Sequence, residues 1–292
     1  METAILKTLI YADVFDFPLK AWEIHKWLIS KRKSELSDVE KILQRLVKQK
    51  RVINKDGYYG LYGRSRVFKR RIDRIAPSQR FMKEARVLTQ VLRLIPWVYL
   101  VGISGNLAVE NASEDDDIDL FVITACNRLW ISRFLILFVL ALMEKRRTKR
   151  DSGKKAAGKY CLNLLLEEDQ LEQKHKDLYI AHEVLQMKPL WERREVYRLF
   201  LEQNNWAFGF LANWLAPASS QSIHGKKLTK RFFLVDHIEA LLRFVQLRYM
   251  GIPRKAETVS AHAVYFHPED NRVRVLREYE TRCRKYLKQK SA

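Results

Sequence analysis

Two aspartates, Asp117 and Asp119, are the residues whose type and spacing best suit catalysis. They stand at the start of an apolar run, residues 118–123, that is typical of a buried strand. Because alternate side chains of a strand share a face, both carboxylates are expected to point the same way, about 7 Å apart along the chain. Such a pair can hold one hard divalent cation, or two such cations about 4 Å apart.

A glycine corner precedes this pair. The apolar run 98–101 leads into Gly102-Ile103-Ser104-Gly105-Asn106, and a short helix is expected to begin at Leu107. Gly105 has no Cβ to keep the backbone away from a phosphate, and the free N–H groups of a helix start attract anions. The pattern predicts a strand, a glycine turn, a short helix, an acidic loop and a second strand. An anion cradle beside metal-binding carboxylates indicates phosphoryl or nucleotidyl transfer.

Residues 98–124 resemble the signature of the DNA polymerase β-like nucleotidyltransferase superfamily, which is a Gly-Ser turn followed by Asp-x-Asp inside an apolar strand. Gly105 and Asn106 stand in the place of the turn, with Ser104 just before it as a further nucleotide-binding candidate. The resemblance implies Mg²⁺ or Mn²⁺ at Asp117 and Asp119. It also implies transfer of a nucleoside monophosphate from an NTP, with ATP the expected donor, to an acceptor that the sequence does not identify.

Two positions depart from that signature. Asn106 replaces the usual Ser, although its amide can still hydrogen-bond a phosphate. The family's third carboxylate lies on a later strand, expected here at residues 160–166, where the matching polar residue is Asn163. Asn163 can coordinate a metal through its carbonyl oxygen but brings no charge; Glu167 and Glu168 are possible replacements. Metal and nucleotide binding are therefore better supported than turnover.

Composition sets the remaining limits. The chain has 292 residues, 47% of them hydrophobic, and carries 54 Lys and Arg against 34 acidic residues, a net charge of +20. This length suits two or three domains with full cores, and the charge favours polyanionic partners without choosing among them. Cys126, Cys161 and Cys283 show no metal or disulfide spacing, which favours a reducing compartment and a cytoplasmic location. Cys126 and Cys161 are expected to be small buried apolar residues.

A membrane span is not expected. The most apolar run, residues 134–143, is short compared with the ~20 residues that a spanning helix needs. We predict a helix packed against the sheet within residues 127–147; a helix that dips into a membrane surface is the alternative.

Residues 1–63 resemble a winged helix-turn-helix. Helices are expected at 3–11 and 21–29, a third is expected to open with a capping box at Ser37 to Glu40, and residues 51–62 read as a hairpin. The third helix would present the basic and amide side chains of Lys41, Gln44, Arg45, Lys48 and Gln49. The wing would present Lys55 and Tyr58. Nucleic acid is therefore a candidate partner. The alternative function is a non-catalytic nucleic-acid-binding regulator with a degenerate transferase domain.

The rest of the chain is predicted to be organised around the signature. Linker helices are expected over residues 64–94 with a break at Ala76-Pro77-Ser78, and the nucleotidyltransferase-like domain over 95–169. Residues 145–159 form a basic loop. Residues 170–292 are predicted to be a helical C-terminal region that closes the cleft. The predicted fold class is α+β, with a small mixed sheet flanked by helices.

Overall fold

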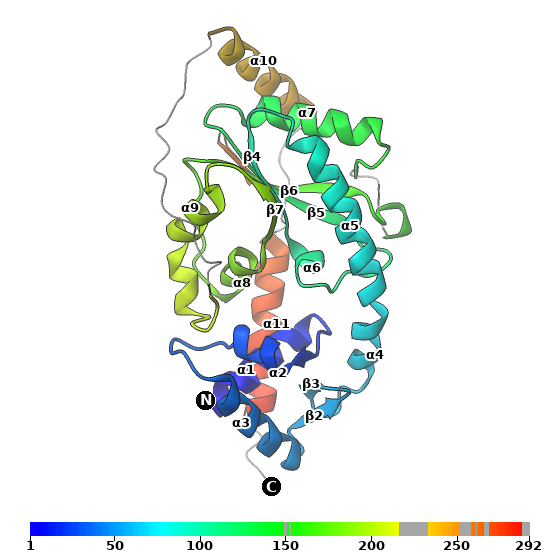
Figure 1. The fold of residues 1–292 in the computed structure, drawn as a ribbon, viewed down its shortest axis with the longest axis vertical. Coiled ribbons are helices and arrows are strands. Elements are labelled where there is room, and N and C mark those ends of the chain that lie inside the picture. Colours follow the sequence, from blue (N-terminus) through cyan, green and yellow to red (C-terminus); the bar gives the residue numbers. More distant parts are fainter. Residues whose placement is uncertain are drawn as a thin grey trace.

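The computed structural model describes residues 1–148, 151, 153–215, 233–250, 258–260, 262–265 and 269–287. Part of the predicted basic loop, residues 149–150 and 152, and the stretch 216–232 lie outside this description. The described chain has the predicted α+β fold, with a small sheet at the N-terminal end and a larger mixed sheet at the centre (Figure 1).

The N-terminal segment combines helices with a small antiparallel sheet. Its elements, in chain order, are α1 (Glu2–Val14), β1 (Leu19–Lys20), α2 (Ala21–Lys26), α3 (Leu36–Lys48), β2 (Val52–Lys55) and β3 (Tyr58–Leu61). The sheet order is β1-β3-β2. The expected helices and hairpin are thus present, and β1 is a strand that the sequence pattern did not reveal. Val39, Leu43 and Leu46 of α3 are fully buried in the shared core.

Two predicted helix boundaries were wrong. Helix α3 begins at Leu36, one residue before Ser37, and within the described residues its N-cap, Glu35, makes no side-chain capping bond. Ser37 therefore lies inside the first turn and does not start a capping box. The predicted break at residues 76–78 falls inside α5 (Ile75–Leu92), which follows α4 (Arg66–Asp73) directly. Pro77 lies in the first turn of α5, where a missing N–H breaks no helical hydrogen bond.

The central sheet is mixed. Among the described residues its strands are β4 (Val98–Ile103), β5 (Ile118–Thr124), β6 (Tyr160–Glu167), β7 (Lys188–Glu192), β8 (Thr258–Val259) and β9 (Ala263–Tyr265), in the order β7-β4-β5-β6-β9-β8. Strands β5 and β6 run parallel, and the other neighbours are antiparallel. The sequence predicted β4, β5 and β6 but did not predict a strand at residues 188–192. They form an edge strand, a place that tolerates Pro189.

Helices cover both faces of this sheet. On one face α5 and α7 (Leu129–Leu142) pack with Val101, Ile118 and Leu120. On the other face α8 (Leu178–Gln186) and α9 (Val196–Gln203) pack with Phe121 and Ile123. The apolar run 134–143, which ends one residue beyond α7, belongs to a helix that packs against the sheet, as predicted; in addition, α10 (Phe233–Met250) lies on α7. In the described part of the chain, every helix is too short or too polar to cross a bilayer.

The last described helix, α11 (Glu269–Leu287), returns to the N-terminal segment and lies along α1 (Figure 1). The Tyr279 and Tyr11 rings meet edge to face, with 5.6 Å between centroids, and Arg282 pairs with the buried carboxylate of Asp13. Tyr286 and Leu287 pack against the N-terminal core. The first and last helices therefore join the N-terminal segment to the rest of the molecule.

Candidate metal and nucleotide site

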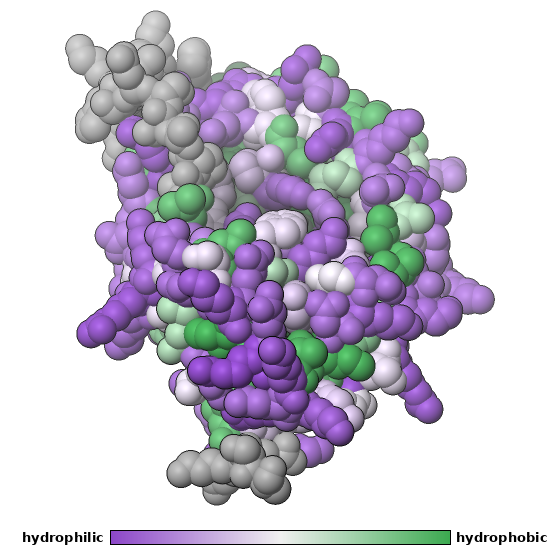
Figure 2. All heavy atoms as spheres, turned by 60° about the horizontal axis from the view of Figure 1, so that its bottom comes forward, coloured by the Kyte–Doolittle hydropathy of each residue, from purple (hydrophilic) through white to green (hydrophobic). Residues whose placement is uncertain are grey.

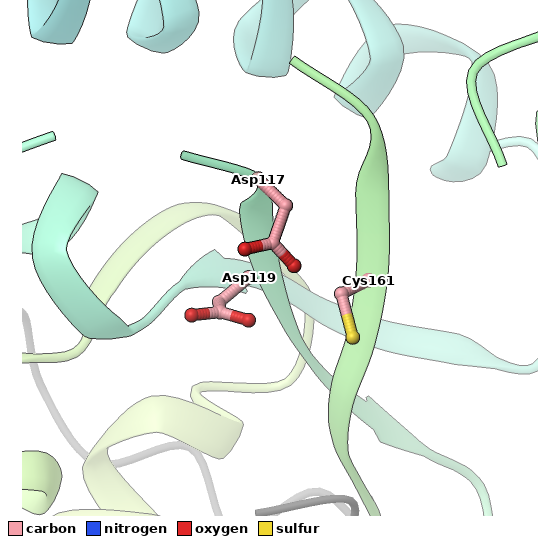
Figure 3. A group of neighbouring side chains, drawn as sticks. All are labelled: Asp117, Asp119 and Cys161. Atoms are coloured by element: carbon pink, nitrogen blue, oxygen red, sulfur yellow. The ribbon is translucent and has the colours of Figure 1, made fainter. Parts of the chain in front are cut away.

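Asp117, Asp119 and Cys161 converge at one end of the central sheet. Their ligand atoms, the carboxylate oxygens and the sulfur, all lie within 4.8 Å of one another, and each residue is half-buried (Figure 3). Asp117 directly precedes β5, Asp119 lies within it, and Cys161 lies on the parallel neighbour β6. The two aspartates therefore point the same way, as the alternation of the strand predicted.

The sheet register places these side chains together. Asp119 is paired with Cys161 across the parallel strands, and Leu120 with Leu162. Ile118 and Leu120 are fully buried on the α5 and α7 side, so Asp119 must point to the opposite face. Cys161 was expected to be a buried apolar residue. Its position beside the aspartates depends on which residues of two distant segments pair, and the spacing of the cysteines contains no signal for that.

The glycine corner lies directly against Asp119. Gly105 has a φ of +62°, and a Cβ at this position would lie 2.4 Å from Oδ2 of Asp119. The Ser104 N–H donates a hydrogen bond of 3.0 Å to the carbonyl oxygen of Asp119. Only a residue without a side chain fits both the left-handed backbone and this contact. Gly105 therefore makes room for the carboxylate.

The other predicted site residues bind their neighbours. Ser104 is buried, and its Oγ accepts a hydrogen bond of 3.2 Å from Nδ2 of Asn163. Asn106 is exposed and donates through Nδ2 to Oδ2 of Asp116 at 3.0 Å. Asp116 also accepts from Oγ of Ser113 at 2.7 Å, which orders the acidic loop. The metal role of Asn163 and the nucleotide-binding roles of Ser104, Gly105 and Asn106 stay predictions.

The electrostatics of the site are those of crowded acids. Burial raises the pKa of Asp117, while Arg147, whose Nη1 lies 2.6 Å from Oδ2 of Asp117, opposes that rise. Burial raises the pKa of Asp119 well above its usual value, and the charges of Asp117 and Glu183 raise it further. Burial, together with both aspartates, also raises the pKa of the Cys161 thiol to about 12. A bound cation would remove this repulsion.

These residues fit a divalent metal ion. Two carboxylates whose oxygens lie close together are ligands that Mg²⁺ and Mn²⁺ prefer. The Gly105 corner leaves the Asp119 carboxylate room that any larger residue would fill. The thiol of Cys161 is a softer ligand than either aspartate, a difference that affects the choice of metal.

A cavity of about 260 Å³ adjoins Asp119 and Gly105. Its walls come from α1, β1, α6 (Gly105–Ala108), α8 and α11, together with Trp27, which directly follows α2. Aromatic side chains and one further carboxylate line it; among them are Tyr11, Phe15, Trp27, Tyr179, His182 and Glu183. The N-terminal segment thus forms one wall of the space in front of the aspartates. Sequence reasoning missed this space because its lining comes from segments far apart in the chain.

Comparison with known proteins adds little to this geometry. No protein-family model matches the chain, and no curated protein matches it. Among solved structures it is similar to one described as "Crystal structure of the toxin-antitoxin with AMP-PNP". The identity is 14%, the match covers 57% of this chain and 97% of that one, and the TM-score is 0.27. A likeness of that degree does not establish a shared function, so the site's own residues must support one.

Replacing Gly105 by Ala should destabilise the protein more than the same change at a permissive glycine. Gly57→Ala is the control, because its φ of +80° imposes the same strain with nothing within 4 Å of the new Cβ. We expect Gly57→Ala to cost about 1–2 kcal/mol for the left-handed backbone. Gly105→Ala should cost about 1–3 kcal/mol more, because it overpacks Asp119. Urea denaturation measures both, and equal losses would contradict the close approach.

Asp119→Asn should stabilise the metal-free protein at neutral pH. The raised pKa of Asp119 means that the folded state binds more protons than the unfolded state between the ordinary Asp pKa of about 4 and the raised value. Stability therefore falls as pH rises through that window, and the amide removes the effect. In EDTA, the variant should melt at a higher temperature than the parent. Asp115→Asn, an exposed control, should not change the melting temperature. A lower melting temperature for Asp119→Asn would contradict the stated direction.

Proposed function

We propose that the chain is a nucleotidyltransferase that transfers a nucleoside monophosphate from an NTP, with ATP the expected donor, to an acceptor hydroxyl. The observation that carries the proposal is the convergence of Asp117 and Asp119 against the Gly105 corner. Carboxylates beside a backbone turn of this kind suit the binding of a nucleoside triphosphate and its metal ion. The resemblance of residues 98–124 to the DNA polymerase β-like superfamily supports the same function.

In this proposal each residue of the site has a distinct task. Asp117 and Asp119 hold Mg²⁺ or Mn²⁺, and the bound ion supplies charge neutralisation for the triphosphate and the leaving pyrophosphate. Gly105 and Asn106 bind the β and γ phosphates. The acceptor hydroxyl attacks the α-phosphorus in line, the bond to pyrophosphate breaks, and the proton passes to the further carboxylate of the cavity, Glu183.

The cavity is the proposed acceptor site. It adjoins Asp119, and walls from α1, α8 and α11 enclose it on several sides. A space of about 260 Å³ accommodates a small molecule or the terminal group of a larger one. Tyr11 and Tyr179 would position that group by its apolar faces, while Glu183 binds a hydroxyl or an amine.

Label transfer from α-labelled ATP, in the presence of Mg²⁺ or Mn²⁺, tests the reaction. The parent should transfer label to itself, to added RNA or to a small alcohol. Asp117→Asn and Asp119→Asn should each lower the rate by about a hundredfold or more, because each removes an ionic metal ligand. Asp115→Asn, an exposed neighbour, should retain the rate. ATP binding without any transfer by the parent would reject catalysis and favour a nucleotide sensor.

A second candidate function, nucleic-acid binding, is favoured by the outer face of α3. Lys41, Gln44, Lys48 and Gln49 are exposed there; Lys41 lies 3.7 Å from Asp38, and Arg45 pairs with Glu2 at 2.6 Å. Figure 2 brings this end of the molecule forward and shows a largely hydrophilic surface. Helix α11 packs on α1, and this face of α3 is exposed. We infer that α3 is the part of the N-terminal segment that would contact a nucleic-acid backbone.

Removing the two exposed lysines of α3 should weaken DNA binding. The double change Lys41→Ala with Lys48→Ala should reduce the slope of log affinity against log salt concentration by about 2, one for each lost phosphate contact. Lys69→Ala with Arg66→Ala, exposed residues of α4, is the control pair. Fluorescence anisotropy of a labelled duplex, measured at several salt concentrations, gives the slope. A slope equal to that of the parent would reject the α3 surface.

A further inference from the structure

The proposed reaction does not use Cys161, although its sulfur lies among the metal-binding oxygens. We infer that Cys161 is the third protein ligand of the cation held by Asp117 and Asp119, and that its sulfur makes the site favour softer divalent ions such as Co²⁺ and Zn²⁺ over Mg²⁺. The inference rests on the proposed metal role of the two aspartates. It does not depend on nucleotidyl transfer.

The distances permit a shared ion. Metal–oxygen and metal–sulfur bonds of about 2.0–2.3 Å separate the ligand atoms of one small ion by about 3–4.5 Å. The three candidate atoms here lie within 4.8 Å of one another, so small side-chain rotations bring them to one centre. Because Asp119 and Cys161 are paired across parallel strands, the backbone holds two of the three ligands at a constant spacing.

A positive group already lies at these side chains. The Arg147 guanidinium donates to Asp117 at 2.6 Å and is hydrogen-bonded to the Cys161 side chain, and both partners raise the pKa of Arg147 against the effect of burial. The backbone N–H of Arg147 donates a hydrogen bond of 3.0 Å to the backbone carbonyl of Tyr160. This bond holds Arg147 beside β6. Two of the candidate ligands therefore bind a cationic group. The Arg147 side chain is 37% exposed, so it can turn outward when an ion competes for Asp117.

The sulfur decides which ions are favoured. A thiol binds a metal as thiolate, so the thiol proton is released to solvent as the metal–sulfur bond forms. Thiolates bind Zn²⁺ and Co²⁺ well, whereas Mg²⁺ demands oxygen ligands. With Cys161 in the third position, Mg²⁺ finds two protein ligands among these three residues, while a softer ion finds three. The substitution Cys161→Asp would make all three ligand atoms oxygen.

Cobalt spectroscopy tests the ligand directly, with full-length protein and no nucleotide. Co²⁺ titrated into the parent should produce a thiolate-to-cobalt charge-transfer band in the near ultraviolet. Cys161→Ser should lose the band, while Cys126→Ser, a change at another half-buried thiol, should retain it. Asp117→Asn should weaken Co²⁺ binding about tenfold. Arg147→Ala should strengthen it several-fold, because a competing cation is gone.

Metal competition tests the selectivity. Mg²⁺ should displace Co²⁺ from Cys161→Asp at about tenfold lower concentration than from the parent, and the charge-transfer band should be absent from this variant. Circular dichroism melts check that both Cys161 variants fold. A parent without the band, or a band that persists in Cys161→Ser, would overturn the inference. Absence of the band in a parent that transfers label with Mg²⁺ rejects the cysteine alone. A parent with the band but without transfer rejects the reaction alone.

Discussion

The site depends on the parallel pairing of β5 with β6. Burial of Ile118 and Leu120 against α5 and α7 forces Asp119 to the other face of the sheet, and the pairing sets Cys161 beside it. In that position the Asp119 carboxylate is repelled by Asp117 and loses part of its hydration, and both effects raise the free energy of its charged form. The hydrophobic core of the sheet provides the free energy that keeps these charges together. A cation bound between Asp117 and Asp119 would remove the repulsion between their carboxylates.

The N-terminal and C-terminal helices complete this arrangement. Asp13 on α1 is buried and pairs with Arg282 on α11 and, at 2.8 Å, with Arg64. Removing one partner of such a group leaves buried charge, so α1 and α11 are expected to move together. They also supply walls of the cavity in front of Asp119. The N-terminal segment is thereby part of the proposed acceptor site.

Much of the fold followed from local patterns. Apolar runs located β4, β5 and β6, and helical patterns located α1, α2 and α3 within a few residues. Strand β7 was missed because residues 170–292 were predicted to be helical, and the extended conformation of β7 depends on its pairing with β4. The capping box at Ser37 also failed, because the approach of the chain from Glu35 places that serine inside the first turn.

The sequence by itself determined the chemistry available at the site. The alternation around Asp117 and Asp119 sets their common direction, because side chains of a strand alternate, and Gly105 marks a turn without a Cβ. Tertiary structure alone decided what surrounds them. Cys161, Arg147 and the wall contributed by α1 come from segments whose proximity depends on strand register and helix packing, which no local spacing encodes. Local sterics set the direction of each side chain, but only long-range burial chooses its neighbours.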